Sequence, residues 1–279
     1  YGFIQDYARC IRQKLWRQKM SSDRVSNLMK GHMESLAAEG KRADGRGINE
    51  FREVKIETGM INTAEGSSMV HLGKTKVLCG IKLLIGTPYG DSPGSGTMTT
   101  STELAPLADQ SFDPGPPREA SIELSRVVDR GIRESRMIDF DALCIEHGER
   151  VWMVYIDLHI LDNGGNLFDC CTLAAAAALS NAKIPNVQHG IADEDVDLPV
   201  TCWPISCTFG RLGDTVILDP TSDEESVMSA RLTVAHDEDG NIRAAQKGMN
   251  GAFTDAEVRE AVKTARKSDN VLREALKGI

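Results

Sequence analysis

The sequence predicts a mixed α+β protein made of two related halves. The expected elements run in the order strands, helix, strand, helix, then strands, helix, which is typical of α+β architecture rather than of a regularly alternating fold. The apolar segment 151–161 has the composition of a buried strand. The alanine-rich segment 170–181 has small residues on every side, so we expect a helix packed closely against its neighbours. A chain of 279 residues can bury one large core or two closely packed ones.

The first half is expected to open with a helix and to continue with antiparallel strands. The helix stops at Gly40, because glycine suits a helix end. Strands follow from residue 54 onward, and a Gly-Lys-Thr turn predicts a hairpin between segments 67–72 and 77–84. Residues 86–117 are rich in Gly, Pro, Ser and Thr, and we expect one long functional loop there.

A second helix is expected to begin near Pro117, since proline fits the first helical turn. Its buried stripe consists of Leu124, Val128 and Ile132. After the apolar strand and the alanine-rich helix, an acidic connector leads into the second half. Strands are predicted there at 201–209, 215–218 and 229–236. A capping-box pattern at Thr254 and Glu257 predicts the start of a last helix.

These elements divide the chain into three parts. We interpret residues 1–22 as an N-terminal extension or tag, residues 23–190 as the first half with its leading helix, and residues 191–279 as the second half. The alternative for the N-terminal part is a basic amphipathic helix that touches RNA or a membrane surface.

Composition indicates a soluble cytoplasmic protein. Apolar residues make up 41% of the chain and charged residues 26%, which excludes wholesale disorder. The longest apolar run, 151–156, is too short to cross a bilayer, and no apolar leader is evident. Seven cysteines form no tight framework, so we expect reduced thiols. The net charge of −9 argues against a general nucleic-acid coat, although a local basic patch can still bind RNA.

Patterns for metal binding or nucleophilic catalysis are weak. The histidines lack the paired spacing of a zinc site, and no cysteine pair has a second pair. Cys170 and Cys171 are interpreted as small buried hydrophobes, with a reactive thiolate pair as the alternative. Asp214 and Asp219, near a strand end, could hold Mg²⁺ or transfer protons. The residues alone favour a solvated acidic face with turn-forming aspartates.

Arginines on the middle helix give the sharpest local signal. At about 100° per residue, Arg126, Arg130 and Arg133 fall on one stripe, opposite the buried residues. Guanidinium groups one turn apart can grip successive phosphates of a single strand. The alternative is a surface of i,i+3 and i,i+4 ion pairs, such as Glu123 with Arg126. Spacing alone leaves both interpretations open.

Six ordered strings between Asp23 and the C-terminus carry a family resemblance. They are Arg42-Ala43-Asp44-Gly45-Arg46, the hairpin 67–82, and segments 112–117, 126–130, 161–166 and 216–225. Together they resemble RNase PH-type exosome proteins, most of all the non-catalytic ring subunit of the archaeal exosome. The resemblance implies an α+β, duplicated RNase PH-type fold, which is ribosomal protein S5 domain 2-like.

The resemblance also implies that the chain is not an enzyme by itself. Active members are phosphorolytic 3′→5′ exoribonucleases, which hold inorganic phosphate with Gly-Ser/Thr-Arg at the start of the second helix, where anions are favoured. The matching stretch, 164–169, has no arginine. Active members also carry two aspartates. Asp219 matches the second, whereas the first falls at or beside Gly213, and the neighbouring Asp214 is shifted by one. Because such a shift in a strand reverses a side chain's face, we expect Asp219 to mark a vestigial site.

By the same resemblance, Arg126 and Arg130 bind the RNA backbone beside an active partner, and Arg133 contributes less. The chain is expected to alternate with the catalytic RNase PH-type subunit in a trimer of heterodimers, topped by RNA-binding cap subunits. It would structure the partner's site for phosphorolysis of single-stranded RNA. We expect no metal and no cofactor in this chain, inorganic phosphate in the partner's site, and no membrane contact.

Two other functions stay open at this point. The first is a phosphorolytic 3′→5′ exoribonuclease that is active in its own right, against which Phe168 and Gly213 argue. The second is a metal-dependent hydrolase that uses Asp214, Asp219 and Glu224, and its weakness is the lack of a convergent His or Cys ligand.

Overall fold

A computed structural model describes residues 28–279. The interpretation of residues 1–22 as an extension or tag, and the alternative of a basic helix there, lie outside the described residues. The first described element is a helix at residues 28–38, and Gly40 follows with a positive φ of 74°, as expected for a helix stop. No helix within residues 28–279 is both long and apolar enough to span a membrane.

Within the described residues, the first sheet has six strands. They are β1 (Val54–Thr58), β2 (Gly66–Leu72), β3 (Thr75–Gly86), β4 (Thr97–Leu104), β5 (Cys144–Glu146) and β6 (Arg150–Asp162). The order is β1-β2-β3-β6-β4, and β5 pairs with β6. The long strand β6 runs antiparallel to β3 and parallel to β4. The predicted hairpin and the predicted apolar strand are both confirmed.

The prediction of one continuous loop over residues 86–117 is wrong, because β4 lies inside this segment. The sequence of β4 is polar, with four threonines in eight residues. Threonine is β-branched and fits a pleated surface, and Met98 and Thr102 turn inward while β6 satisfies the backbone. The polar composition therefore masked a strand whose partner is distant in the sequence.

The second sheet is fully antiparallel. It contains β9 (Ile205–Leu212), β10 (Thr215–Leu218), β11 (Ala230–His236) and β12 (Ile242–Gly248), in the order β10-β9-β11-β12. Strands β10 and β11 match the prediction, β9 begins four residues later and ends three residues later than predicted, and β12 was not predicted. That strand is an exposed edge with little apolar side-chain area, so it carries no hydrophobic alternation. The short elements β7 (Lys183–Ile184), α4 (Asn186–His189) and β8 (Val196–Asp197) lie between α3 and the second sheet, and η1 (Asp141–Leu143) directly precedes β5.

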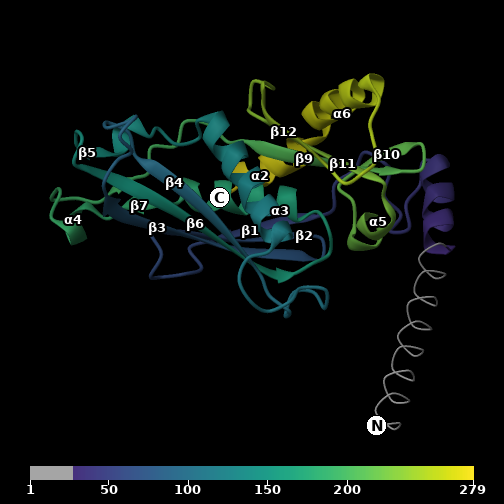
Figure 1. Cartoon of the computed structure of the whole chain (residues 1–279), viewed down its shortest axis with the longest axis horizontal. Helices are drawn as coiled ribbons and strands as arrows, with labels where there is room; N and C mark the ends of the chain where they lie inside the picture. The colour runs from purple at the N-terminus through teal and green to yellow at the C-terminus, as the bar shows by residue number, and fades with distance from the viewer. Residues whose placement is uncertain (1–27) are drawn as a thin grey trace, which may run out of the picture.

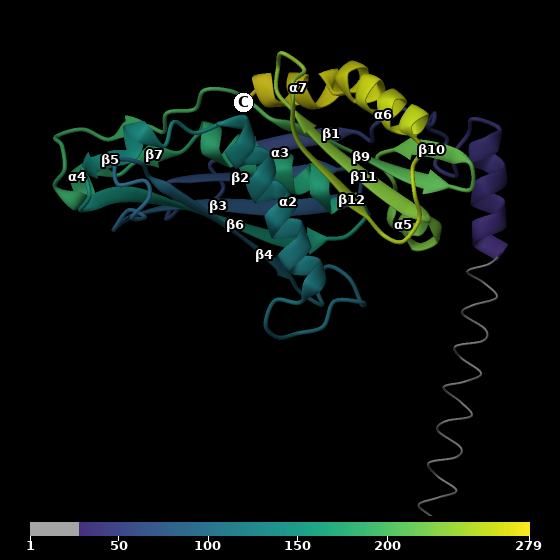
Figure 2. The same cartoon turned by 45° about the horizontal axis from the view of Figure 1, so that its top comes forward.

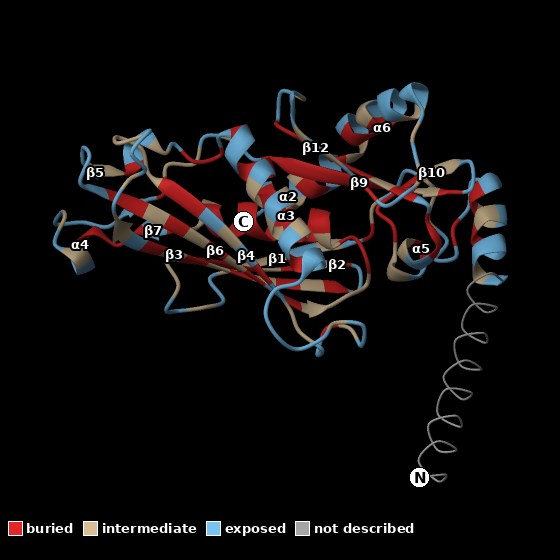
Figure 3. Ribbon diagram, viewed as in Figure 1, coloured by how far each residue is buried: buried red, intermediate tan, exposed pale blue. Residues whose placement is uncertain are grey.

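Two helices lie between the sheets and connect them (Figure 1). Helix α2 (Glu119–Ser135) contacts β4 of the first sheet and β11 and β12 of the second. Helix α3 (Leu167–Ser180) contacts β2, β3 and β9, and its residues 168–179 are all buried (Figure 3). The prediction of a closely packed alanine-rich helix is confirmed, with a start three residues earlier than Cys170. The predicted buried stripe of α2 is confirmed too.

The C-terminal helix of the prediction is divided into α6 (Asp255–Ser268) and α7 (Asn270–Lys277), with α5 (Ser222–Val227) preceding them (Figure 2). The predicted capping box at Thr254 is present. The division falls at Asp269, whose carboxylate binds the buried His236 ring at 3.0 Å and also pairs with Arg273. As a result α6 packs on β11 while α7 packs on β1.

The start of α3 requires glycine at position 165. Gly165 has a φ of +90°, and an added Cβ would lie 2.3 Å from the Ser222 nitrogen and 2.4 Å from the Thr221 carbonyl carbon. Both neighbours are backbone atoms, so they cannot rotate away. This contact fixes α3 against the segment that follows β10.

We therefore expect Gly165→Ala to destabilise the fold much more than Gly148→Ala. Gly148 has a similar φ of +80° with no atom within 4 Å of its added Cβ, so that variant measures left-handed strain alone, about 1–2 kcal/mol. The additional backbone clash at position 165 should add about 1–3 kcal/mol. Denaturant unfolding of both variants measures the difference. Equal losses would show that the contact with residues 221 and 222 yields easily.

Candidate functional site

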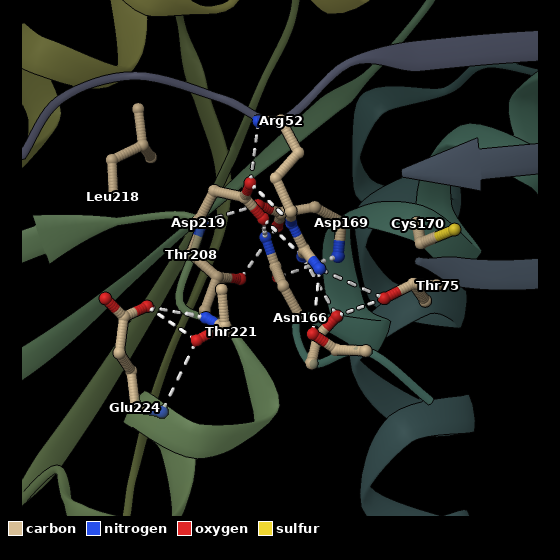
Figure 4. Close-up of polar contacts among 12 residues, drawn as sticks. Arg52, Thr75, Asn166, Asp169, Cys170, Thr208, Leu218, Asp219, Thr221 and Glu224 are labelled. Atoms are coloured by element: carbon tan, nitrogen blue, oxygen red, sulfur yellow. Dashed lines mark hydrogen bonds and ion pairs between the residues drawn. The ribbon is translucent and has the colours of Figure 1, made fainter. Parts of the chain in front are cut away.

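Asp219 lies directly after β10 and its side chain is fully buried (Figure 4). Arg52 forms two bonds to the carboxylate, from Nη2 to Oδ1 at 2.7 Å and from Nε to Oδ2 at 2.9 Å. Arg46 donates from Nη1 to Oδ2 at 2.8 Å, and the Asn166 amide donates to Oδ1 at 2.7 Å. The backbone N–H of Arg52 adds a bond of 2.9 Å to Oδ2. Three segments that are distant in sequence therefore meet at one carboxylate.

The charged turn that carries the Arg-Ala-Asp-Gly-Arg string forms a clamp around this point. Arg42 donates to the carbonyl oxygens of Leu218 and Asp219 at 2.7 and 2.8 Å, and its guanidinium pairs with buried Glu224. Glu224 in turn completes a capping box with Thr221 at the start of α5. Arg42 and Arg46 of this string therefore have a structural role, because they hold the chain in place directly after β10.

The charge state of Asp219 follows from two opposing effects. Burial raises the pKa of this carboxyl group, but the hydrogen bonds and positive charge of Arg52 outweigh burial, so the pKa lies below its ordinary value. The stabilisation is complete above the ordinary aspartate pKa of about 3.9 and is lost as pH falls through the lower folded value. With five donors on two oxygens, the carboxylate has no lone pair free for a metal ion.

The expectation for residues 213 and 214 needs correction. Both lie in the turn between β9 and β10 rather than in a strand, so a reversal of strand face does not apply. Asp214 is fully exposed and lies 3.6 Å from Arg211. The four-residue β10, about 13 Å long, separates Gly213 from Asp219. An acidic side chain at position 213 would therefore lie too far from Asp219 to form a pair of acids with it.

The acid that the structure brings beside Asp219 is Glu225, six residues later. The backbone N–H of Asn166 donates to Glu225 Oε1 at 2.9 Å, while the Asn166 side chain binds Asp219. Burial raises the pKa of Glu225 to about 6, although the hydrogen bond from Asn166 and the charge of Arg231 lower it. Glu225 therefore places a carboxylate at the N-terminus of α3, the position where a helix favours an anion. Sequence reasoning missed it because position 225 stood among many acids.

Phe168 and Arg231 cover the same end of α3. The Arg231 guanidinium lies over the Phe168 ring, 3.9 Å from its centre, and it also forms an ion pair with Glu123 of α2. Asp169, in the first turn of α3, is fully buried, and burial raises the pKa of its carboxyl group to about 7, opposed by hydrogen bonds from Asn166 and Thr208. The segment 164–169 is therefore occupied by the chain's own side chains.

The three acids of the hydrolase alternative do not converge. Asp214 points to solvent, whereas Asp219 and Glu224 are each bound by arginines. Across residues 28–279, no group of three His, Cys, Asp or Glu side chains is arranged to hold a metal ion. The interpretation as a solvated acidic face holds for residues 193–197 and 214, but it is wrong for Asp219 and Glu224, which are buried. Cys170 and Cys171 are confirmed as buried, and burial raises the pKa of both thiols.

Helix α2 presents its arginines in two different ways. Arg126 and Arg130 are exposed, and within residues 28–279 neither guanidinium has a carboxylate within 4 Å. Arg133 instead forms two 3.1 Å bonds to Asp129 and a 2.8 Å bond to the Met98 carbonyl. The suggested Glu123–Arg126 ion pair does not form, because Glu123 pairs with Arg231. Among the described residues, the stripe predicted from helical spacing therefore contains two arginines without an acidic partner, one turn apart, and a third that is paired.

The two sheets with α2 and α3 between them define a duplicated α+β protein whose acid site is sealed by arginines. The chain belongs to the 3′ exoribonuclease (RNase PH) family. Domain 1 of that family matches residues 50–185, and domain 2 matches residues 202–268. The fold class and the family predicted from the sequence are confirmed, whereas the division at residue 190 stays a prediction.

Relatives and solved structures support the same placement. The chain is 48% identical over 260 residues to the exosome complex component Rrp42 of Methanocella arvoryzae, a match that covers 93% of this chain and 100% of that protein. It is 42% identical to a chain of the Archaeoglobus fulgidus exosome with RNA bound to the active site, with a TM-score of 0.87 over 90% of this chain and 98% of that one. A chain of an archaeal exosome core gives 39% identity and a TM-score of 0.85, covering 92% and 99% of the two chains.

We expect Asp219→Asn to destabilise the protein by about 3–5 kcal/mol, because it leaves Arg46 and Arg52 buried beside a neutral group. Asp214→Asn is the matched control, and as an exposed substitution it should change stability by no more than about 0.5 kcal/mol. Denaturant unfolding at neutral pH compares the two. A loss at position 219 no larger than that at position 214 would contradict the structural role of this carboxylate.

Proposed function

We propose that this protein is the non-catalytic, RNA-contacting ring subunit of an archaeal exosome. The observation that carries the proposal is the contrast between its arginines. The arginines around Asp219 form ion pairs with buried acids of the chain, whereas Arg126 and Arg130 on α2 are exposed and unpaired within the described residues. Such a pair can bind phosphates of a single RNA strand without reading its bases.

The relatives support the assembly. Proteins that resemble this chain over most of its length are named as exosome components or come from exosome structures, one of which is an exosome with RNA bound to the active site. We infer that this chain alternates with a catalytic RNase PH-type subunit in a trimer of heterodimers, beneath RNA-binding cap subunits, in the cytoplasm. Inorganic phosphate would then act in the partner's site, and this chain would guide single-stranded RNA towards it.

A second candidate is an exoribonuclease that is active by itself, and the closeness of Asp219 and Glu225 to Asn166 favours it. Three features oppose this candidate. The Asp219 oxygens are saturated, the start of α3 carries Phe168 in place of an arginine, and the nearby guanidinium of Arg231 is committed to Glu123. We therefore place the chemistry in the partner.

We expect no phosphorolysis by the isolated chain, because the phosphate would lack a free cationic anchor. Gly213→Asp should not create activity either, because β10 separates position 213 from Asp219. The Cβ of the new residue would instead lie beside the Glu34 carboxyl group, 3.4 Å from its carbon. The assay is phosphate-dependent release of nucleoside diphosphates from labelled poly(A), with the assembled ring as positive control. Release by the pure chain would favour the self-active candidate, and turnover in Gly213→Asp would contradict our account of the defect.

We expect Arg126→Ala with Arg130→Ala to weaken RNA binding by the assembled ring across sequences. Each lost phosphate contact on single-stranded RNA should reduce the slope of log affinity against log salt by about 0.7, and both by about 1.4. Arg133→Ala should change the slope less, because that side chain is committed to Asp129 and Met98. Titrations at several salt concentrations measure this, and size-exclusion chromatography checks assembly. An unchanged slope and decay rate in the double variant would end the RNA-binding role.

A further inference from the structure

Arg126 has an acidic neighbour on each side along α2. Glu123 lies three residues before it and Asp129 three residues after it. Residues at this spacing lie next to each other on a helix surface and form ion pairs readily. Either acid could therefore neutralise Arg126 and remove it from RNA binding. The structure avoids both pairs.

Each of these acids is bound by a different arginine. Asp129 accepts two 3.1 Å bonds from Arg133, one turn further along the same helix. The side chain of Glu123 extends from α2 to the second sheet and pairs with Arg231 of β11. Its partner is not on the helix at all, so this pair depends on how α2 packs against the second sheet.

The fold provides a specific place for Arg231. Its guanidinium stacks over Phe168 at 3.9 Å, which fixes the plane of the group. Gly248 is the residue paired with Arg231 across β11 and β12, and an added Cβ there would lie 2.5 Å from Arg231 Nη2. The side chain of Arg231 is only 12% exposed, whereas that of Glu123 is 39% exposed. A nearly buried arginine thus reaches out to hold a half-exposed acid.

We propose that Arg231 is a positioning residue for RNA binding, because it holds Glu123 away from Arg126 and so keeps the Arg126 guanidinium free for a phosphate. The inference rests on the proposed function of α2. It adds that the free charge of Arg126 is maintained by a residue on another element, which would not touch the RNA. Arg133 has the same effect on Asp129, on the other side.

Removal of Arg231 should have two effects with the same sign. Glu123 becomes free to pair with Arg126 at i,i+3 spacing, and its unpaired carboxylate also repels an approaching phosphate. A surface ion pair of this kind corresponds to about a two- to fivefold loss of RNA affinity. If Arg126 loses its phosphate contact, the salt slope should also fall by up to about 0.7.

The test uses the ring assembled with its catalytic partner and labelled single-stranded poly(A). Arg231→Met should lower affinity, Glu123→Gln should leave it equal or higher, and the double variant should return to the level of the unmodified ring. In an Arg126→Ala background, Arg231→Met should have a smaller effect, because there is no longer an Arg126 to neutralise and only the repulsion between the freed Glu123 carboxylate and the RNA phosphate remains. A purely structural role predicts instead that Glu123→Gln also lowers affinity and does not rescue.

Arg243→Met is the matched control for charge. Arg243 lies on the neighbouring strand β12 and pairs with Asp237, which is not on α2. Its removal subtracts the same charge from the same sheet and should leave RNA affinity unchanged. An equal loss in Arg243→Met and Arg231→Met would mean that net charge, not the position of Glu123, decides binding, and it would overturn the proposal.

The two hypotheses fail in different ways. An unchanged affinity and slope in the Arg126→Ala, Arg130→Ala ring refutes the RNA role of α2 itself. A loss in that ring without any loss in Arg231→Met, or without rescue by Glu123→Gln, refutes only the positioning role. Size-exclusion chromatography and thermal unfolding confirm that each ring is assembled. Glu123→Gln keeps the test informative even when Arg231→Met assembles poorly, because Glu123 is half-exposed.

Discussion

The buried Asp219 carboxylate is the interaction on which the arrangement of this protein depends. Its oxygens accept hydrogen bonds from Arg46 of the charged turn, from Arg52 just before β1, and from Asn166 at the start of α3. A buried charge is tolerable only when it is paired and fully hydrogen-bonded, and here every acceptor site is used. These hydrogen bonds stabilise the place where the two sheets meet. Because they occupy both oxygens, the Asp219 carboxylate is not available to bind a metal ion or to transfer a proton.

Arginine performs two opposite tasks in the same fold. Around Asp219 and Glu224 the guanidinium groups are sealed by internal acids, and their charge is cancelled. On α2 the acids Asp129 and Glu123 instead pair with Arg133 and Arg231, and within residues 28–279 Arg126 and Arg130 have no acidic partner. Under the proposed function, a net charge of −9 does not prevent binding of RNA, because the binding would depend on which arginines remain unpaired and not on the total charge.

Local patterns predicted what depends on neighbours in sequence. The stripe of Leu124, Val128 and Ile132 fixes the orientation of α2, so the exposure of Arg126 and Arg130 followed from the helical period. Features that depend on distant partners were not predictable in this way. Strand β4 forms only because β6 pairs with it, and Glu123 is diverted only because Arg231 reaches it from β11. The closeness of Glu225 to Asp219 likewise arises from their shared contacts with Asn166, which no spacing along the chain reveals.

The central claim is that RNA meets this chain at α2 and not at Asp219. A structure of the assembled ring with single-stranded RNA and inorganic phosphate tests it most directly. The account predicts RNA phosphates within hydrogen-bond distance of Arg126 and Arg130, Glu123 still paired with Arg231, and Asp219 still enclosed by Arg46 and Arg52. A phosphate, a metal ion or the RNA 3′ end bound at Asp219 or at the start of α3 in this chain would contradict it.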